Sequence, residues 1–181
     1  EGGALDPETG FLYVGSQTNP SVLAMVEGGD RSDMNYILGF ARAQVARGVP
    51  LVKPPWGRIT ALDLTDGTLA WMVPNGDTPE GVAEQLELDP ADVPRTGKVS
   101  RAGVLVTKTL LLAGEGSSGA PVFRALDKAT GRTIAEINLP NTQLGLPMTY
   151  MHDSRQFIVV SVGGSGEPSE LIALALPTDN Q

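Results

Sequence analysis

The chain has 181 residues, of which 41% are hydrophobic, and this composition excludes a disordered polypeptide. Its formal net charge of −8 argues against nucleic acid and anionic membrane surfaces as partners. The absence of cysteine excludes disulfides and thiolate metal sites, and the one histidine, His152, cannot form a zinc site or a catalytic triad by itself.

Targeting and membrane segments are not apparent in the sequence. The longest apolar run, residues 104–114, is interrupted by Lys108 and two threonines, whereas a spanning helix needs about 20 apolar residues. We find no signal-peptide pattern, because the chain opens within a turn motif at residues 1–10.

The first 55 residues predict short strands separated by turn residues. The segment Phe11–Ser16 follows an Asp-Pro-Glu-Thr-Gly turn, and Ser21–Val26 ends at two glycines. Residues 34–44 are compatible with a helix or a strand, and we favour a strand because Gly39 weakens a helix. Three prolines before residue 56 then impose extended backbone.

Residues 58–73 predict a β-hairpin, with the turn Thr-Asp-Gly at residues 65–67. Its pattern Ala-Leu-Asp-x-x-x-Gly recurs at residues 125–131, and a weaker copy at residues 4–10 is a turn resemblance rather than a true repeat. We expect Gly67 and Gly131 to have positive φ at equivalent places of superimposable hairpins, because glycine adopts that conformation without steric cost. Each turn aspartate is expected to bind backbone N–H groups of its own turn.

The remaining sequence begins with a long acidic loop, residues 75–100. Thr78 and Pro79 are typical of a helix start, so residues 79–86 predict a short helix. Seven β-forming runs then follow at a spacing of about ten to fifteen residues, with Gly, Pro, Asp or Asn at the breaks. They are residues 103–106, 109–113, 122–126, 132–139, 146–150, 157–162 and 170–176. This spacing predicts an all-β protein, and the turn repeat favours stacked four-stranded units over a sandwich.

A meander of antiparallel strands places alternate connections at opposite ends of each unit. The short connections lie near Lys108 and at residues 65–67, 128–131 and 152–155. The longer connections are residues 17–55, 75–100, 115–120, 141–145 and 163–168. Long loops on a rigid β scaffold usually carry the functional site, so we expect the site at their end of the units. His152 falls at the opposite end, and we expect no catalytic role for it.

Several segments, taken in order, resemble the C-terminal part of dehydrogenases that depend on pyrroloquinoline quinone (PQQ), of the membrane-type glucose dehydrogenase-like subgroup. They are residues 6–14, 54–63, 71–76, 105–109, 114–116 and 145–150. The resemblance implies an eight-bladed β-propeller in which the Ala-x-Asp-x-x-x-Gly-x-x-x-Trp hairpin is the blade signature. Trp71 is then expected to dock between blades, and Ala135 departs from the signature.

This resemblance implies about three four-stranded blades, at approximately residues 1–76, 77–140 and 141–177. The first is expected to lack most of its inner strand and the last its outer strand, which the N-terminus of the whole chain supplies in closed members of the family. We therefore expect a single β-propeller segment that is a fragment of a longer chain. A self-contained domain that pairs with a second copy is the alternative.

For the full-length parent, the resemblance implies oxidation of a sugar or alcohol in the periplasm, with PQQ and calcium as cofactors and a quinone or similar electron acceptor. Family calcium ligands and the aspartate base lie in earlier blades. We therefore expect neither catalytic nor metal-ligating residues here, and no tight cofactor binding by this segment alone. Its partners are expected to be the remainder of the propeller or another copy of itself. A non-catalytic propeller scaffold and a carbohydrate-binding β domain remain alternatives.

Arg101 and Ser100 are the first pair of candidate cofactor-binding residues. They lie where the acidic loop enters a predicted inner strand, so Arg101 can point toward the axial channel and pair with a carboxylate of PQQ. The alternative is a surface arginine that neutralises Asp89 or Asp92.

Thr18 and Asn19 are the second pair, because they end a predicted second strand at the long-loop end and can line the cavity. The alternative for Asn19 is a turn-forming role before Pro20. Lys53 and Trp56 flank the two adjacent prolines and are candidates for a pocket wall, with a packed loop as the alternative.

Overall fold

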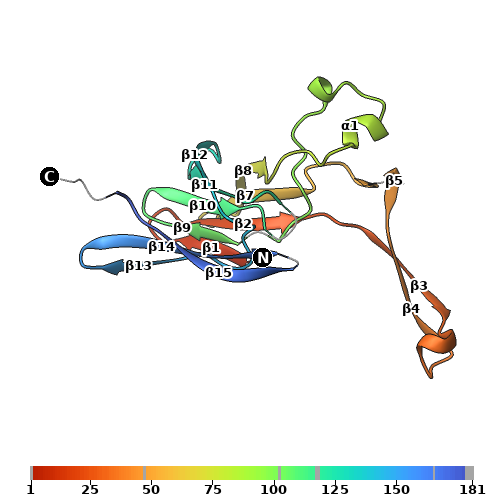
Figure 1. Ribbon diagram of the computed structural model, residues 1–181. Helices are drawn as coiled ribbons and strands as arrows, with labels where there is room; N and C mark the ends of the chain where they lie inside the picture. The colour runs from red at the N-terminus through yellow and green to blue at the C-terminus, as the bar shows by residue number, and fades with distance from the viewer. Residues whose placement is uncertain (1, 47, 102, 117–118, 165, 178–181) are drawn as a thin grey trace.

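The computed structural model describes residues 2–46, 48–101, 103–116, 119–164 and 166–177. Most strands lie in three successive antiparallel sheets, ordered β1-β2-β7-β8, β12-β11-β10-β9 and β13-β14-β15, and two small hairpins are added by β3-β4 and β5-β6. The strands are β1 (Gly2–Asp6), β2 (Phe11–Gln17), β3 (Ser21–Glu27), β4 (Tyr36–Arg42), β5 (Gln44–Ala46), β6 (Val49–Pro50), β7 (Gly57–Asp63), β8 (Thr68–Pro74), β9 (Val104–Val106), β10 (Leu110–Gly114), β11 (Val122–Asp127), β12 (Thr133–Asn138), β13 (Met148–His152), β14 (Arg155–Gly164) and β15 (Glu167–Leu174). The prediction of an all-β propeller segment is confirmed (Figure 1).

The three sheets are arranged as neighbouring blades whose innermost strands are β1, β9 and β13. Strand β1 contacts β9, and both Gly2 and Gly103 lie against Leu146, just before β13. The outer strands β8 and β12 are largely exposed. Strand β1 pairs with β2 from Gly2↔Gly15 to Asp6↔Phe11, so the expectation that the first blade lacks most of its inner strand is wrong.

The two hairpins predicted to be repeats are equivalent in register. Ala61 pairs with Trp71 and Ala125 with Ala135, and each hairpin has a bulge directly after that first alanine. The turn glycines Gly67 and Gly131 have φ of 75° and 71°. In both turns the glycine N–H donates to the carbonyl oxygen of the turn aspartate at 2.9 Å, and the aspartate carboxylate accepts backbone N–H groups. The repeat prediction is confirmed.

The hydrophobic core is divided between the two blade interfaces. Leu111 and Ala113 of β10 face the first sheet, in a cluster with Tyr13 and Ile59. Leu112 faces the third sheet, in a cluster with Phe123, Leu139, Val160 and Val162. Successive residues of a strand point to opposite faces, and β10 is therefore apolar on both because it lies between two sheets.

Trp71 docks the first blade onto the second, as predicted. Its indole Nε1 donates a hydrogen bond to the carbonyl oxygen of Lys128 at 3.0 Å, and its ring lies directly over Gly131. The Tyr13 hydroxyl donates to the same carbonyl oxygen at 3.3 Å. Ala135, at the equivalent position of the second blade, is exposed and has no ring to offer the third blade.

An ion pair between Asp6 and Lys128 stabilises the same interface at the end of the sheets that carries the short turns, which we call the tight-turn end. The Lys128 ammonium group donates to the Asp6 carboxylate and to the carbonyl oxygens of Thr107 and Lys108. The hydrogen bond from Lys128 is the main cause that lowers the pKa of Asp6, against the opposing effect of burial.

We expect the Asp6 pair to make stability depend on acid pH. Because the pKa of Asp6 is lower in the folded than in the unfolded chain, its contribution is complete above the unfolded value and is lost as pH falls through the folded value. Urea unfolding of wild type and Asp6→Asn should differ most at pH 7, and the difference should shrink as the pH approaches 3. A difference that stays constant over this range would contradict the role given to the pair.

The acidic loop contains less helix than predicted. The helix α1 covers only Val82–Gln85 and is capped by Gly81, with φ of 78°, instead of starting at Pro79. Thr78 does not cap it, because its Oγ1 donates to the carbonyl oxygen of Pro94 and accepts the N–H of Thr96, both at 3.2 Å. The other helical segments are single 3₁₀ turns, Gly29–Arg31 and Pro90–Asp92. Among the described residues, no helix is long and apolar enough to cross a membrane.

Two further connections can be compared with the predictions. Residues 36–42 form a strand, which confirms the strand favoured over a helix at residues 34–44. The predicted long connection at residues 163–168 is wrong, because β14 continues to Gly164 and β15 begins at Glu167, so that only two residues separate the strands.

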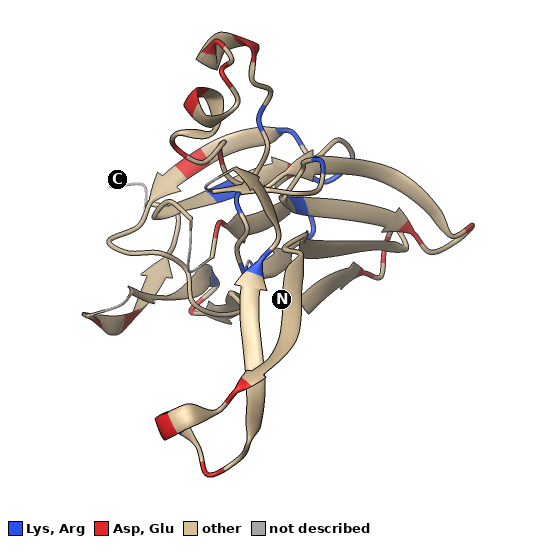
Figure 2. Ribbon diagram, turned by 90° about the vertical axis from the view of Figure 1, so that its right-hand side faces the viewer, with Lys and Arg blue, Asp and Glu red and all other residues tan. Residues whose placement is uncertain are grey.

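Strands β3 and β4 form a projecting two-stranded hairpin, which we call the arm. It leaves the first blade after β2 and extends away from the three sheets (Figure 1). Its large apolar side chains are exposed, among them Leu23, Met25, Leu38 and Phe40, each at least 62% accessible. Acidic residues gather at its tip, and Lys or Arg lies at its base (Figure 2).

Candidate functional site: the long-loop end

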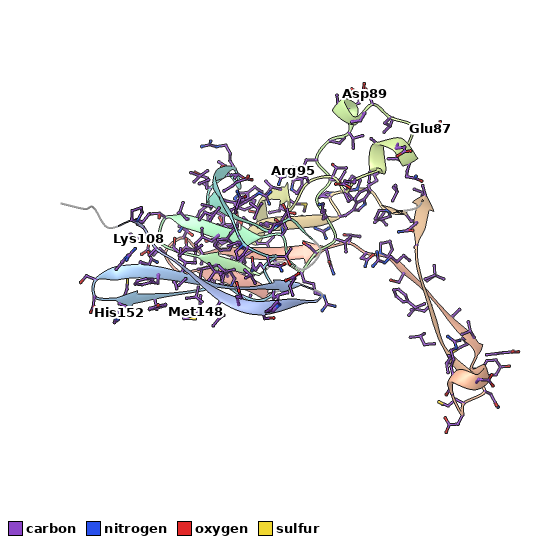
Figure 3. The ribbon with its side chains drawn as sticks, viewed as in Figure 1. Glu87, Asp89, Arg95, Lys108, Met148 and His152 are labelled. Carbon is purple, nitrogen blue, oxygen red and sulfur yellow. The ribbon has the colours of Figure 1, made fainter. Side chains whose placement is uncertain are left out.

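The two ends of the sheets differ in the connections they carry, as predicted. Figure 3 shows Lys108 and His152 at the tight-turn end, opposite the arm and the loop that carries Glu87 and Asp89. His152 is exposed there and lies 3.3 Å from the Asp153 carboxylate. The long connections therefore meet at the other end, which we call the long-loop end.

Arg101 and Ser100 lie at the inner edge of the long-loop end, just before β9. Arg101 is exposed and borders a hollow of about 200 Å³, together with Gly103 and residues 144–146. Ser100 is buried, with 7% of its surface accessible. This position next to the innermost strands is the one that the sequence predicted for Arg101.

Thr18 and Asn19 directly follow β2 at the long-loop end. The Thr18 hydroxyl accepts a hydrogen bond from the Arg58 guanidinium at 2.6 Å, and the Thr18 N–H donates to the carbonyl oxygen of Trp56 at 2.7 Å. Thr18 thus fixes the loop backbone, whereas Asn19 is exposed and borders a second hollow of about 350 Å³. The four predicted residues thus lie at the same end, but only Arg101 and Asn19 border hollows, and the two hollows are different.

Trp56 is both packed and part of the wall of the second hollow. It is 3% accessible and clusters with Val49 and Val82. Its indole N–H donates to the carbonyl oxygen of Val52 and its backbone N–H to that of Thr96, both at 2.8 Å. These bonds hold the indole in a fixed orientation. Lys53, the other residue predicted for a pocket wall, is exposed and does not border this hollow.

A buried ion pair, Glu115 with Arg124, was not predicted. Glu115 is 1% accessible, and its Oε1 lies 2.5 Å from an Arg124 guanidinium nitrogen, while its Oε2 accepts the Ala120 N–H at 2.7 Å. Arg124 Nε also donates to Glu136 at 2.7 Å. Burial opposes the charge of Arg124, but the hydrogen bonds to both glutamates outweigh it and raise its pKa. The sequence did contain an indication of this pair, because Arg124 is a charged residue in the middle of the apolar run Val122–Leu126.

Two buried amide side chains connect all three blades beneath these loops. Gln143 Oε1 accepts the Gly114 N–H at 2.7 Å, and Gln143 Nε2 donates to the carbonyl oxygens of Gly103 and Gly145. Asn75 Nδ2 donates to the carbonyl oxygen of Gly114 at 3.1 Å. Because buried amides bonded in this way fix the backbone around them, the loops rest on a rigid base.

The described acidic side chains at this end do not gather into a metal site. Within the described ranges, no three His, Asp or Glu side chains lie close enough together to hold a metal ion. Glu115 is already engaged by Arg124 and the Ala120 N–H, so it is not available as a ligand.

A family comparison identifies residues 1–158 with the model described as "PQQ: Glucose/ethanol/alcohol dehydrogenase, beta-propeller domain". The probable quinate dehydrogenase (quinone) of Xanthomonas campestris pv. juglandis is 33% identical over 152 residues, which cover 78% of this chain and 18% of that protein. The quinoprotein glucose dehydrogenase of Escherichia coli (strain K12) is 28% identical over 141 residues, or 73% of this chain and 17% of that protein.

The chain spans between about a sixth and a quarter of the length of the curated relatives that it matches. Among solved structures, the quinohemoprotein alcohol dehydrogenase of Comamonas testosteroni superposes with a TM-score of 0.64 at 20% identity. The superposition covers 99% of this chain and 27% of that one, and at this identity the likeness concerns the fold alone.

Proposed function

The chain belongs to the PQQ-dependent glucose/ethanol/alcohol dehydrogenase β-propeller family, and from this we propose that it forms blades of an enzyme that oxidises a hydroxyl group of a sugar or alcohol. The observation that carries the proposal is the family match over residues 1–158, together with the two equivalent hairpins at residues 58–74 and 122–138, the first of which docks through Trp71. We assign the electrons to a quinone or similar acceptor and the reaction to the periplasm.

In this proposal, residues 1–76, 77–140 and 141–177 are three successive blades of a larger ring. The outer edge of β15 has no partner strand within the described part of the chain. Unpaired edges readily accept another strand, so we propose that the remaining blades of a longer chain, or a second copy, complete this sheet.

The long-loop end would contribute binding and orientation rather than proton transfer. We propose that the Arg101 guanidinium holds a carboxylate of PQQ, with Ser100 beside it. Thr18 and Asn19 belong to the neighbouring loop of the same end, where Thr18 fixes the backbone through Arg58 and Asn19 borders the other hollow. The Gln143 and Asn75 hydrogen bonds support this role because they fix the backbone next to Arg101. PQQ, when bound, supplies the two-electron acceptor for the substrate hydroxyl. We assign the calcium ligands and the catalytic base to other blades, since the carboxylates that the structure describes do not converge.

The proposal predicts that Arg101 contributes to PQQ binding in the whole enzyme, whereas the isolated chain does not bind PQQ tightly. In a protein that carries the complete ring, Arg101→Gln should weaken PQQ binding about tenfold, because a charge-assisted hydrogen bond is lost. Lys108→Gln, at the opposite end, should leave it unchanged. The isolated 181 residues should bind neither PQQ nor calcium tightly, because an axial cofactor needs walls from all around the ring and the described acidic side chains do not gather into a calcium site.

Fluorescence titration measures PQQ binding, and PQQ-dependent dye reduction with glucose, quinate and ethanol tests the reaction. Tight binding of PQQ by the isolated chain would overturn the assignment of the other contacts to further blades. A whole protein that reduces no dye with PQQ would point to a non-catalytic scaffold, and sugar binding without PQQ would point to a carbohydrate-binding domain.

A further inference from the structure

The hollow at the base of the arm has the features of a binding site of its own. It has a volume of about 350 Å³, within the range of small-molecule sites, and lies where the arm, the 43–50 segment and the acidic loop meet. Asn19 borders it from one side, Arg42 and Gln44 from the end of the arm, and Glu80 and Lys98 from the acidic loop. It shares no residue with the hollow next to Arg101.

The floor of this hollow is preformed and apolar. Trp56 is packed against Val49 and Val82, and its indole N–H is already bonded to Val52, so the ring has no polar group left to offer. A fixed apolar surface beneath polar walls favours a ligand with carbon–hydrogen faces and polar edges, because little side-chain entropy is lost on binding.

The walls carry an excess of positive charge in an acidic chain. Arg42 and Lys98 both border the hollow, and within the described residues neither lies within 4 Å of a carboxylate. Glu80 is the one acidic side chain of the wall. The amides of Asn19 and Gln44 add groups that both donate and accept hydrogen bonds.

We propose that the hollow binds a small polyhydroxylated carboxylate. Arg42 and Lys98 would bind the carboxylate group and Asn19 and Gln44 the hydroxyl groups. The carbon skeleton would lie against the apolar residues of the lining, Pro50, Pro79 and Val99, which the packed Trp56 supports. A neutral polyol of the same size leaves both cations without a counter-charge and therefore binds more weakly. The inference concerns binding alone and stands whether or not the whole protein oxidises this ligand.

Gluconate and sorbitol form a matched pair of probes, because they share six carbons and differ by a carboxylate in place of a terminal alcohol. In NMR titrations of the chain, gluconate should bind and sorbitol should bind at least tenfold more weakly. Arg42→Gln and Lys98→Gln should each weaken gluconate binding about tenfold, and Glu80→Gln should strengthen it, since it removes the opposing charge. These side chains lie outside the buried core, so the variants are expected to fold, and circular dichroism checks this.

Lys108→Gln is the control, because it removes the same charge at the tight-turn end (Figure 3). It should not alter gluconate binding. Equal affinities for gluconate and sorbitol would overturn the proposal, as would folded Arg42→Gln and Lys98→Gln variants that bind gluconate like the wild type. Neither result bears on PQQ binding at Arg101, which is measured separately.

Discussion

Replacing Glu115 by alanine is expected to lower the free energy of unfolding by about 3–5 kcal/mol, because it leaves the buried Arg124 charge without its closest partner. Arg124 keeps only Glu136, whose side chain is 53% exposed and whose attraction is therefore weakened by water. The Ala120 N–H also loses its acceptor. Denaturant unfolding of wild type and variant measures the difference.

Two variants distinguish the buried pair from a general loss of packing. Glu136→Ala removes a carboxylate from the same guanidinium and should cost less than about 1 kcal/mol, since this partner is half exposed. The double variant Glu115→Leu/Arg124→Met replaces both charges by apolar groups and should lose less stability than Glu115→Ala alone. Equal losses for Glu115→Ala and Glu136→Ala would refute the importance given to burial.

The second large effect is expected at Gly131, where alanine should cost about 3 kcal/mol. Positive φ with a side chain costs about 1–2 kcal/mol, and the new methyl group would lie 2.7 Å from two carbons of the Trp71 ring, which adds an overpacking cost of about 1–3 kcal/mol. Gly67 has nearly the same φ but open space around it, so Gly67→Ala should cost only about 1 kcal/mol.

A double-mutant cycle separates these two contributions. In a Trp71→Ala background the ring is gone and only the contact of 2.9 Å with Val73 Cγ1 remains, so Gly131→Ala should cost less than in the wild type but still somewhat more than Gly67→Ala. Thermal or denaturant unfolding of the four proteins gives the coupling energy. If Gly131→Ala costs the same with and without Trp71, the contact between the ring and the glycine does not determine the effect.

The strands and repeated hairpins could be predicted because their signals are local. Apolar alternation and the Asp-x-x-x-Gly turns depend on residues close in sequence, and the bulges after Ala61 and Ala125 lie at the same place of each repeat. The prediction for Thr78 failed because its hydroxyl bonds to Pro94 and Thr96, which the fold brings back across the loop.

The sequence predicted at which end of the propeller segment the candidate site lies, but it did not predict which side chains lie together there. Glu115 and Arg124 meet because Ala113 pairs with Arg124 across β10 and β11, and this register depends on a connection whose course the sequence does not reveal. The hollow at the base of the arm unites residues 19, 42–44, 48, 50, 56, 79–80 and 98–99, and no spacing in the sequence indicates that these segments converge. Position along a strand was predictable, whereas the grouping of side chains into separate hollows needed the tertiary structure.

The arm also determines how the chain is expected to behave at high concentration. Each of its two strands has one backbone edge without a partner strand in the described structure, and residues 22–26 are a run of Val, Leu, Ala and Met without charge or proline. Such ribbons are templates for cross-β aggregation. Pro20 before the run and Glu27, Asp30 and Asp33 after it act as gatekeepers, because proline cannot join a ladder and like charges keep neighbouring ribbons apart. Resistance to amyloid formation is therefore expected to rest on a few residues at the two ends of the arm, and replacing the acidic ones by neutral residues is expected to remove most of that protection.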